Sequence, residues 1–397
     1  MSAGTVSRGA RLFVAAGAVW LPAAWLAVAA GRPRVAVTLA LFGFVLHTVF
    51  GKAYSLVPAY FDRDLAFPRA PTVQVPLTVL GTAGLAAAPL FGSPLSTSIE
   101  RAGAVCWALG AAVFLGTVAW TVRDNLSGSA TGTGEANADR RPVDRLANAF
   151  VPVVLAYLAV GSYAVLAGAT PLPTLFDGYR PRASHLLAAG TGALLVFTVG
   201  LRLLPRFTVA HPPKSLVPVV LVPGAVGPAL IAVGLPSGPV VHAGATLESV
   251  AVVTFAGIIA VLFARSPRRR VGFYGVLAGV SFGVVGVLLG LSLAFVAPDP
   301  TVVAVHRTVN LFGFLGLTIV GVSYQFYPPA VGSFPGGSDR TALTVIAAIA
   351  AGLLAYGAGT LSGLQLLATA GVALATAGAI GHAVLLLGLF VDRYGSR

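Results

Sequence analysis

Twelve long apolar stretches, each able to cross a lipid bilayer as a helix, dominate the sequence. A helix rises 1.5 Å per residue, so about 20 residues span the roughly 30 Å of hydrocarbon. The stretches lie at roughly 10–30, 35–60, 71–92, 99–122, 146–168, 183–207, 214–234, 239–264, 271–297, 301–329, 341–361 and 364–391. Charged residues make up only 9% of the chain, against about 25% in soluble globular domains. We therefore predict an all-α polytopic membrane protein that forms a single integral membrane domain over residues 1–397.

One of these stretches recurs along the chain. Residues 41–58 align without a gap on residues 311–328, and eight of the 18 positions are identical, in a Gly-x7-Gly-x2-Tyr-x3-Pro frame. A weaker third copy, residues 188–205, keeps the first Gly and the closing Pro. The copies lie on the second, sixth and tenth stretches, and such repeats often place a site at their interfaces. We predict three pseudo-repeated four-helix units at approximately 1–122, 146–265 and 266–397, with a flexible polar cytoplasmic linker at 123–145.

The net charge of +13 raises the question of nucleic-acid binding, but the distribution of the cations argues against it. With the N-terminus inside, seventeen Lys and Arg fall in inner loops and tails, five in outer loops and three within the stretches. This asymmetry is the positive-inside pattern of membrane proteins. We therefore predict a multi-pass plasma-membrane protein that has both termini in the cytoplasm and binds no nucleic acid.

Histidine is the residue type on which any bound metal or haem must mainly rely. Cys106 is the only Cys and Met1 the only Met, which excludes a thiolate cluster, a c-type haem attachment and a thioether ligand. By helical rise, His185, His242 and His306 lie about 5–8 Å below the outer boundary, on three different stretches. Three imidazoles at one level could converge on copper or zinc, or two could clamp a haem. The alternative is that each is a hydrogen-bonded packing residue.

Polar residues also fall deep inside the apolar stretches. His47 lies near mid-membrane, and Tyr54 follows seven residues later on the same helical face, with Lys52 between them. We interpret His47 as a ligand or proton-relay residue, unless a hydrogen bond to a neighbouring helix satisfies it. Glu248 is the one carboxylate well inside a stretch. We predict that Glu248, Tyr54 and Lys52 relay protons, or that Glu248 pairs with Arg202 or Arg307.

Two Arg residues lie within the sixth and tenth stretches. Arg202 and Arg307 could neutralise haem propionates or another anion, or extend towards the membrane interface. Asn310 lies one helical turn after His306, where its side chain could contact the imidazole of a ligating His306 and orient the ring.

The two remaining histidines have simpler interpretations. His382, late in the twelfth stretch, is predicted to be a local packing residue. His211, in the inner-loop sequence Ala-His-Pro-Pro-Lys, is predicted to be solvated.

The second and sixth stretches, with the residues that follow the sixth, carry a recognisable set: Phe42, Gly43, Phe44, Gly51, Pro58, His185, Gly190, Gly192, Arg202, and then His211 and Lys214. This set resembles the NnrS family, twelve-span haem- and copper-containing membrane proteins associated with nitric-oxide metabolism. Twelve spans with His on the second, sixth and tenth also resemble subunit I of haem–copper oxidases. Residues 37–40 read Val-Thr-Leu-Ala where the family has a His-Glu pair, and the oxidase pairs of His are absent. The resemblance implies haem or copper binding near the outer face rather than oxygen reduction.

We therefore expect an integral membrane protein that binds haem and/or copper and is linked to nitric-oxide or respiratory metabolism. The predicted cofactor-binding residues are His185, His306, His47, Arg202 and Arg307, and the predicted metal ligands are His185, His242 and His306. A soluble electron donor would dock on the outer face, and an enzymatic role would be that of a haem–copper-type oxidoreductase. The alternatives are a transporter or channel, with His47, Lys52, Glu248 and Arg202 lining a polar path, or a non-catalytic oxidase assembly factor.

Overall fold

The predicted apolar stretches are all helical in the computed structural model. The structure describes residues 2–296 and 298–395; it is 83% helical and contains no strand in those ranges. Twelve helices among the described residues are long and apolar enough to span a membrane, for example Lys214–Gly234 and Pro239–Arg265. Their ends lie within a few residues of the predicted ends except in the fifth span, which covers Glu135–Ala169 where 146–168 was predicted. Residue 297, the predicted end of the ninth stretch, falls outside the described residues. The prediction of an all-α, multi-pass membrane protein is confirmed.

The helices divide into two compact units rather than the three predicted. Unit 1 comprises Met1–Phe13 and His47–Arg265, and unit 2 comprises Val14–Leu46 and Ser266–Arg397. The boundary falls inside α1 (Ser2–Ala29). The remaining helices of unit 1 are α3 (His47–Tyr60), α4 (Ala70–Ala87), η2 (Ala88–Leu90), α5 (Leu95–Val122), η3 (Glu135–Arg140), α6 (Arg141–Ala149), α7 (Val151–Ala169), α8 (Arg180–His185), η4 (Leu186–Ala193), α9 (Leu194–Thr208), η5 (Lys214–Leu216), α10 (Val217–Gly234) and α11 (Pro239–Arg265).

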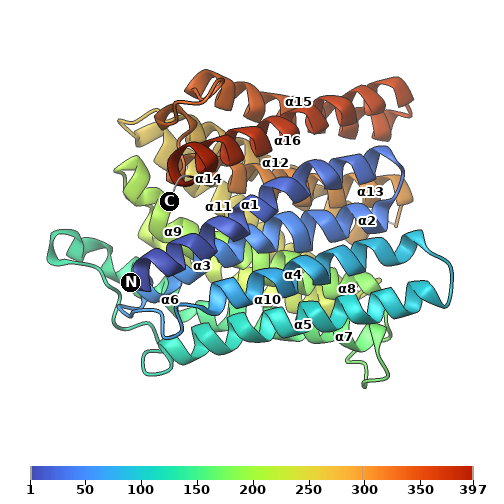
Figure 1. Cartoon of the computed structure of the whole chain (residues 1–397), viewed down its shortest axis with the longest axis horizontal. Helices are drawn as coiled ribbons and strands as arrows, with labels where there is room; N and C mark the ends of the chain where they lie inside the picture. Colours follow the sequence, from blue (N-terminus) through green and yellow to red (C-terminus); the bar gives the residue numbers. More distant parts are fainter. Residues whose placement is uncertain (1, 297, 396–397) are drawn as a thin grey trace. The chain divides into compact units, whose positions relative to one another are not determined.

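Unit 2 contains the second part of α1 and the C-terminal helices. Its other helices are α2 (Pro33–Thr38), η1 (Leu39–Leu46), α12 (Val271–Phe295), α13 (Pro300–Thr308), η6 (Val309–Leu317), α14 (Thr318–Phe326), η7 (Pro329–Val331), α15 (Asp339–Ser362) and α16 (Gln365–Tyr394). The successive helices α15 and α16 run side by side as a hairpin (Figure 1). In unit 1, α4 with α5 and α10 with α11 form similar hairpins.

The three spans that carry the sequence repeat are the most buried of the twelve. Buried residues make up 89% of the apolar window in Pro33–Tyr60, 78% in Arg180–Thr208 and 67% in Pro300–Val331, but at most half in each of the other spans. A span enclosed by other helices can carry polar side chains that a lipid-facing span cannot. The repeat therefore marks the inner helices of the protein.

Each of these inner spans contains a π-helical segment at an equivalent position. The segments η1, η4 and η6 begin at Leu39, Leu186 and Val309, which correspond to one another in the sequence alignment. π-Helical turns are rare and occur frequently at functional sites. The coincidence supports the sequence repeat, whereas the division of the whole chain into three four-helix units is not confirmed.

A glycine in each π-helical segment packs against an aromatic ring of the preceding span. The ring of Trp20 contacts Gly43, that of Tyr157 contacts Gly190 and that of Phe282 contacts Gly313 (three contacts, each within one unit). A Cβ atom built on any of the three glycines would lie closer than 3.0 Å to the aromatic side chain. Small residues of this kind let helices approach closely in membranes.

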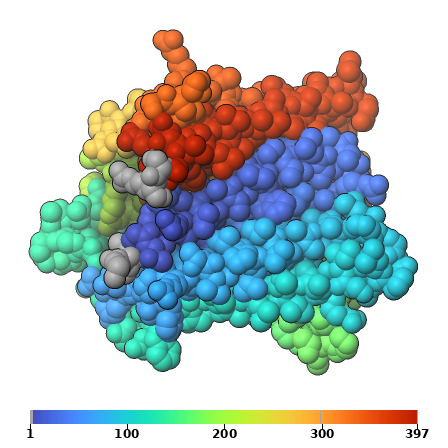
Figure 2. Space-filling view, in the orientation of Figure 1, coloured from blue at the N-terminus to red at the C-terminus, as the bar shows by residue number. Residues whose placement is uncertain are grey.

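The outer helices present apolar side chains on the surface. Leu366 and Val391 of α16 are 85% and 71% exposed, and Leu80 of α4 is 60% exposed. The space-filling view shows the side chains of α16 and α4 on the visible face (Figure 2). In a membrane-spanning protein such residues contact lipid.

The polar segment 123–145 is tied to the neighbouring helices, which differs from the predicted flexible linker. The amide of Asn125 donates to the carbonyl oxygens of Phe61 and Ala130, at 3.0 and 2.8 Å. The last residues of the segment form η3 and the first turn of α6, where Asp144 is 1% exposed. The low-complexity composition of residues 123–145 does not indicate that a few polar side chains anchor the segment.

Candidate functional site

The imidazole of His306 is held by the backbone of a neighbouring helix. Its Nδ1 lies 2.9 Å from the carbonyl oxygen of Gly286 in α12. Because a carbonyl oxygen only accepts hydrogen bonds, Nδ1 carries the proton and Nε2 holds the lone pair. Asn310 lies beside the ring as predicted, and its Nδ2 donates to the carbonyl oxygen of His306 at 2.8 Å. Nδ2 also lies 3.3 Å from Nδ1 of the ring, but both nitrogens carry protons in this tautomer, so this contact is not a hydrogen bond.

The N-terminus of α13 sets the position of His306. Asp299 caps the helix by accepting hydrogen bonds from the N–H groups of Thr301 and Val302, at 2.7 and 3.0 Å, and Pro300 occupies the first turn. The N–H groups of Val302 and Thr301 hold the pKa of the Asp299 carboxyl below its usual value. The cap therefore remains charged at neutral pH.

His185 is also half-buried, but its hydrogen bond is local. Its Nδ1 lies 2.8 Å from the carbonyl oxygen of Pro181 in the same short helix. The helix is anchored by Arg182, whose Nη1 donates to the carbonyl oxygens of Ala232 and Val233, both at 2.7 Å, at the C-terminus of α10. These carbonyls have no partner within their own helix, so Arg182 caps α10 and fixes the start of the sixth span.

The predicted three-histidine metal site gains no support. His242 lies half-buried near the start of α11. Among the residues that the structure describes, no three or more His, Cys, Asp or Glu side chains are grouped so as to hold a metal ion. The ligand set of His185, His242 and His306 stays a prediction.

His47 lies in a buried aromatic cluster of unit 1. Its side chain is fully buried, and its ring centroid is 5.7 Å from that of Phe13. Phe13 also contacts the ring of Tyr54, at 6.3 Å, so His47 and Tyr54 lie on the same side of their helix as predicted. The hydroxyl of Tyr54 donates to Oε1 of Gln74 in α4, at 2.7 Å. Lys52 is half-buried between them in sequence.

Arg202 is fixed inside unit 1 by partners that the sequence did not indicate. Its Nε lies 3.3 Å from Asp144, Nη1 donates to the carbonyl oxygen of Tyr60 and to Asn148, and Nη2 donates to the carbonyl oxygen of Thr131. The predicted pairing of Glu248 with Arg202 is therefore wrong, because Asp144 is the carboxylate partner. With these contacts, the guanidinium binds the polar segment 123–145 to the C-terminal end of α3.

Glu248 is buried, and no residue that the structure describes forms an ion pair with it. It is 8% exposed, and its Oε2 forms no hydrogen bond within the described part of the chain. Gly227 of α10 packs against it, and a Cβ built there would lie 2.9 Å from the Glu248 amide nitrogen. Tyr54 and Glu248 have different neighbours, so the proton relay from Glu248 through Tyr54 and Lys52 stays a prediction.

The sequence analysis missed a buried histidine–tyrosine pair in unit 2. The hydroxyl of Tyr324 lies 3.1 Å from Nδ1 of His382, and the two side chains are 2% and 1% exposed. Phe44 of η1 packs edge-on against the His382 ring, at 6.2 Å between centroids. The repeat offered a signal, because Tyr324 aligns with Tyr54, which is also buried and bonded to a polar residue of another helix.

His211 is solvent-exposed as predicted. Its side chain is 57% exposed, and Nδ1 lies 3.2 Å from Asp139.

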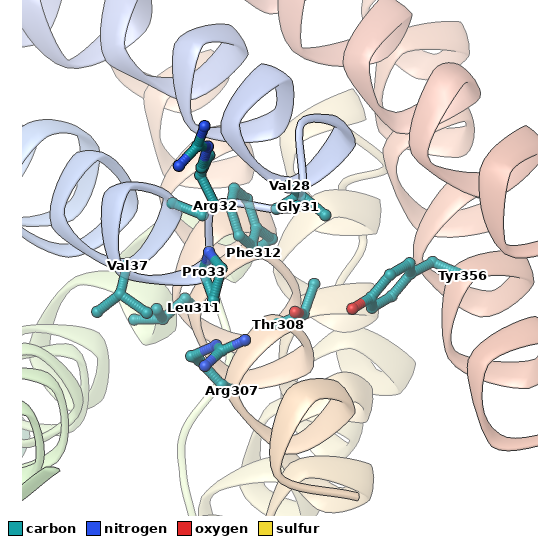
Figure 3. A pocket seen from close by; sticks show the side chains of 11 residues that line it. Val28, Gly31, Arg32, Pro33, Val37, Arg307, Thr308, Leu311, Phe312 and Tyr356 are labelled. Atoms are coloured by element: carbon teal, nitrogen blue, oxygen red, sulfur yellow. The ribbon is translucent and has the colours of Figure 1, made fainter. Parts of the chain in front are cut away.

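Arg307 lines a pocket in unit 2. The pocket has a volume of about 220 Å³ and is bordered by the turn between α1 and α2, by α13 and η6, and by α15. Figure 3 shows the Arg307 side chain and the Tyr356 hydroxyl on opposite sides of it, with Arg32 at its edge. His306 is not among the lining residues.

Comparison with known proteins gives no family: no protein-family model matches the chain, and no curated protein matches it.

Haem and copper need different numbers of imidazole ligands. A protein copper site of the predicted kind needs about three imidazoles together, and no such group is present in the described ranges. A haem iron needs only one or two axial ligands. A half-buried His306 with Nδ1 bonded to a carbonyl has the tautomer that iron ligation requires.

Proposed function

We propose that this protein is an integral membrane haem protein of the plasma membrane, with His306 as an axial ligand of the iron. The observation that carries the proposal is the hydrogen bond between Nδ1 of His306 and the carbonyl oxygen of Gly286, at 2.9 Å. When the non-ligating ring nitrogen of a metal-bound histidine donates to a carbonyl oxygen, the bond fixes the orientation of the ring and raises the basicity of the ligating nitrogen.

The surroundings of His306 support this role. The surface of α12 that faces the ring has no side chain at Gly286 or Gly290. A Cβ at Gly290 would lie 3.1 Å from Cε1 of His306. The π-helical segment η6 begins three residues after His306. The tenth span is one of the three most buried spans, where a polar group that lacked a function would be costly.

Bound haem would supply one-electron chemistry and an open coordination site for a small gas such as nitric oxide. The chain would contribute the axial imidazole and exclude water from it. We place both termini in the cytoplasm from the charge distribution, which puts His306 towards the outer face, where a soluble electron donor would dock.

The proposal is tested by the absorption spectrum and metal content of protein purified from cells supplied with haem and copper. We expect a Soret band and about one haem iron per chain. Copper at one equivalent per chain without a Soret band would show that the bound cofactor is copper rather than haem. Colourless protein with neither metal would refute both forms of the proposal.

A further inference from the structure

A half-buried cation near the start of a membrane-spanning segment of unit 2 faces a pocket, and the described residues offer it no carboxylate partner. Arg307 is half-buried within the span Pro300–Val331, and neither a hydrogen bond nor an ion pair of its guanidinium occurs among the described residues. Asp299, the nearest acidic residue in sequence, caps α13. A buried charge is stable only when it is paired or hydrogen-bonded.

The pocket offers hydrogen-bond donors and no acidic group. Arg307 contributes a guanidinium group, and the side chain of Tyr356 places a hydroxyl opposite it (Figure 3). Arg32 also lines the pocket, but its guanidinium group points away from these two side chains (Figure 3). The hydroxyl of Thr308 is already used, because it donates to the carbonyl oxygen of Ala304 at 2.8 Å. Arg32 is exposed and lies next to Gly31, whose φ of +63° forms the tight turn between α1 and α2.

These donors suit a phosphate group. A guanidinium presents paired N–H donors in a planar fork that matches two oxygens of a phosphate, and charge-assisted bonds of this kind are strong. The volume of about 220 Å³ lies below the roughly 300–1,000 Å³ of pockets for drug-sized ligands, so the pocket suits a small group. Val28 and Phe312 add apolar surface to its walls.

We infer that this pocket binds a phosphate-bearing anion, with Arg307 and Tyr356 as its contacts. Two sources have this chemistry: the headgroup of an anionic phospholipid, and free inorganic phosphate. The inference does not depend on haem, because His306 does not line the pocket and the test below uses no haem signal.

The test measures binding to detergent-purified full-length protein in two arms. In the first, the melting temperature is followed against inorganic phosphate at constant ionic strength, with chloride as the reference anion. In the second, native mass spectrometry compares retention of phosphatidylglycerol with that of phosphatidylcholine. Both arms use the wild type, Arg307→Gln, Tyr356→Phe and a control, Arg34→Gln. Arg34 has the same charge and lies two residues from Arg32, but it does not line the pocket.

We expect Arg307→Gln to weaken binding at least about tenfold, as the loss of a charge-assisted contact does. Tyr356→Phe should weaken it less, and Arg34→Gln should match the wild type. If only phosphatidylglycerol is retained, the ligand is a lipid headgroup; if phosphate alone shifts the melting temperature, it is a free anion. The inference is overturned if the wild type shows neither response. It is also overturned if Arg307→Gln and Arg34→Gln bind the ligand equally well. If Arg307→Gln does not fold, Tyr356→Phe is compared with Arg34→Gln instead, and equal binding by these two variants overturns the inference.

Discussion

Tyr324 and His382 form a buried pair between α14 and α16, with 3.1 Å between the phenolic oxygen and Nδ1. Both side chains are almost fully enclosed. A buried polar group that loses its partner keeps its desolvation penalty, which amounts to about 1–3 kcal/mol. The pair therefore holds two helices of unit 2 together through a single hydrogen bond.

We expect Tyr324→Phe to lower the free energy of unfolding by about 1–3 kcal/mol. His382→Leu should have an effect of similar size, and the double variant should lose less than the sum of the two. A double-mutant cycle on melting temperatures in detergent measures this coupling. Strictly additive effects would show that the two side chains do not interact.

The salt bridge between Arg202 and Asp144 gives a second prediction. The side chains are only 3% and 1% exposed, and Asp144 also pairs with Arg206, at 2.6 Å. Removing Asp144 therefore leaves the buried guanidinium of Arg202 without its carboxylate, and Asp144→Asn should destabilise the protein by about 3–5 kcal/mol. The surface pair Arg141–Glu135 serves as the control, because Glu135 is 88% exposed and Glu135→Gln should cost less than about 1 kcal/mol. Equal effects of Asp144→Asn and Glu135→Gln on the melting temperature would contradict this account.

Acidic pH should weaken the anchor at the start of the sixth span. The hydrogen bonds from Arg182 hold the pKa of the Asp177 carboxyl below its usual value in the folded protein. Asp177 therefore stabilises the fold fully above the ordinary aspartate pKa of about 3.9, and this contribution is lost as the pH falls through the lower folded value. Melting temperatures of the wild type and Asp177→Asn should converge as the pH falls below about 4. A constant difference across the acidic range would be inconsistent with this ion pair.

Close packing at the π-helical glycines predicts that a single methyl group is not tolerated. In Gly313→Ala the new Cβ would lie 2.7 Å from Cβ of Phe282. The helices must then move apart, and overpacking of this kind costs about 1–3 kcal/mol. In the control, Gly116→Ala, nothing lies within 4 Å of the new Cβ, so stability should be unchanged or slightly higher. The ratio of folded to aggregated protein after graded heating compares the two variants, and similar losses in both would argue against the close contact.

The fold could be predicted from sequence because its signal is spread over many residues. Hydropathy gave the twelve spans, since each needs only about 20 apolar residues. The repeat of 41–58 in 311–328 falls on two of the three most buried spans, although this burial was not predicted from it. The π-helical segments could not be predicted, because an extra residue in a helical turn leaves no mark in an apolar pattern. The division of the helices into two compact units could not be predicted either, because it arises from contacts between helices that are distant in sequence.

The site was predicted less well, because single polar residues depend on their neighbours. Arg202 was interpreted as an anion ligand or a partner of Glu248. Its true partner, Asp144, lies in a segment whose composition is typical of a flexible linker. His382 was interpreted as a packing residue because nothing near it in sequence is polar, whereas Tyr324 is 58 residues away. The position of Asn310 beside His306 was predicted, because one helical turn separates them.

The haem content of three purified variants, measured side by side, tests the central claim most directly. The variants are the wild type, His306→Ala and His211→Ala, the last with its exposed loop histidine as the matched control. We predict about one haem per chain in the wild type and in His211→Ala, and little or none in His306→Ala at equal protein yield. Full haem content in a folded His306→Ala variant, or none in the wild type, would contradict the proposal that His306 binds haem.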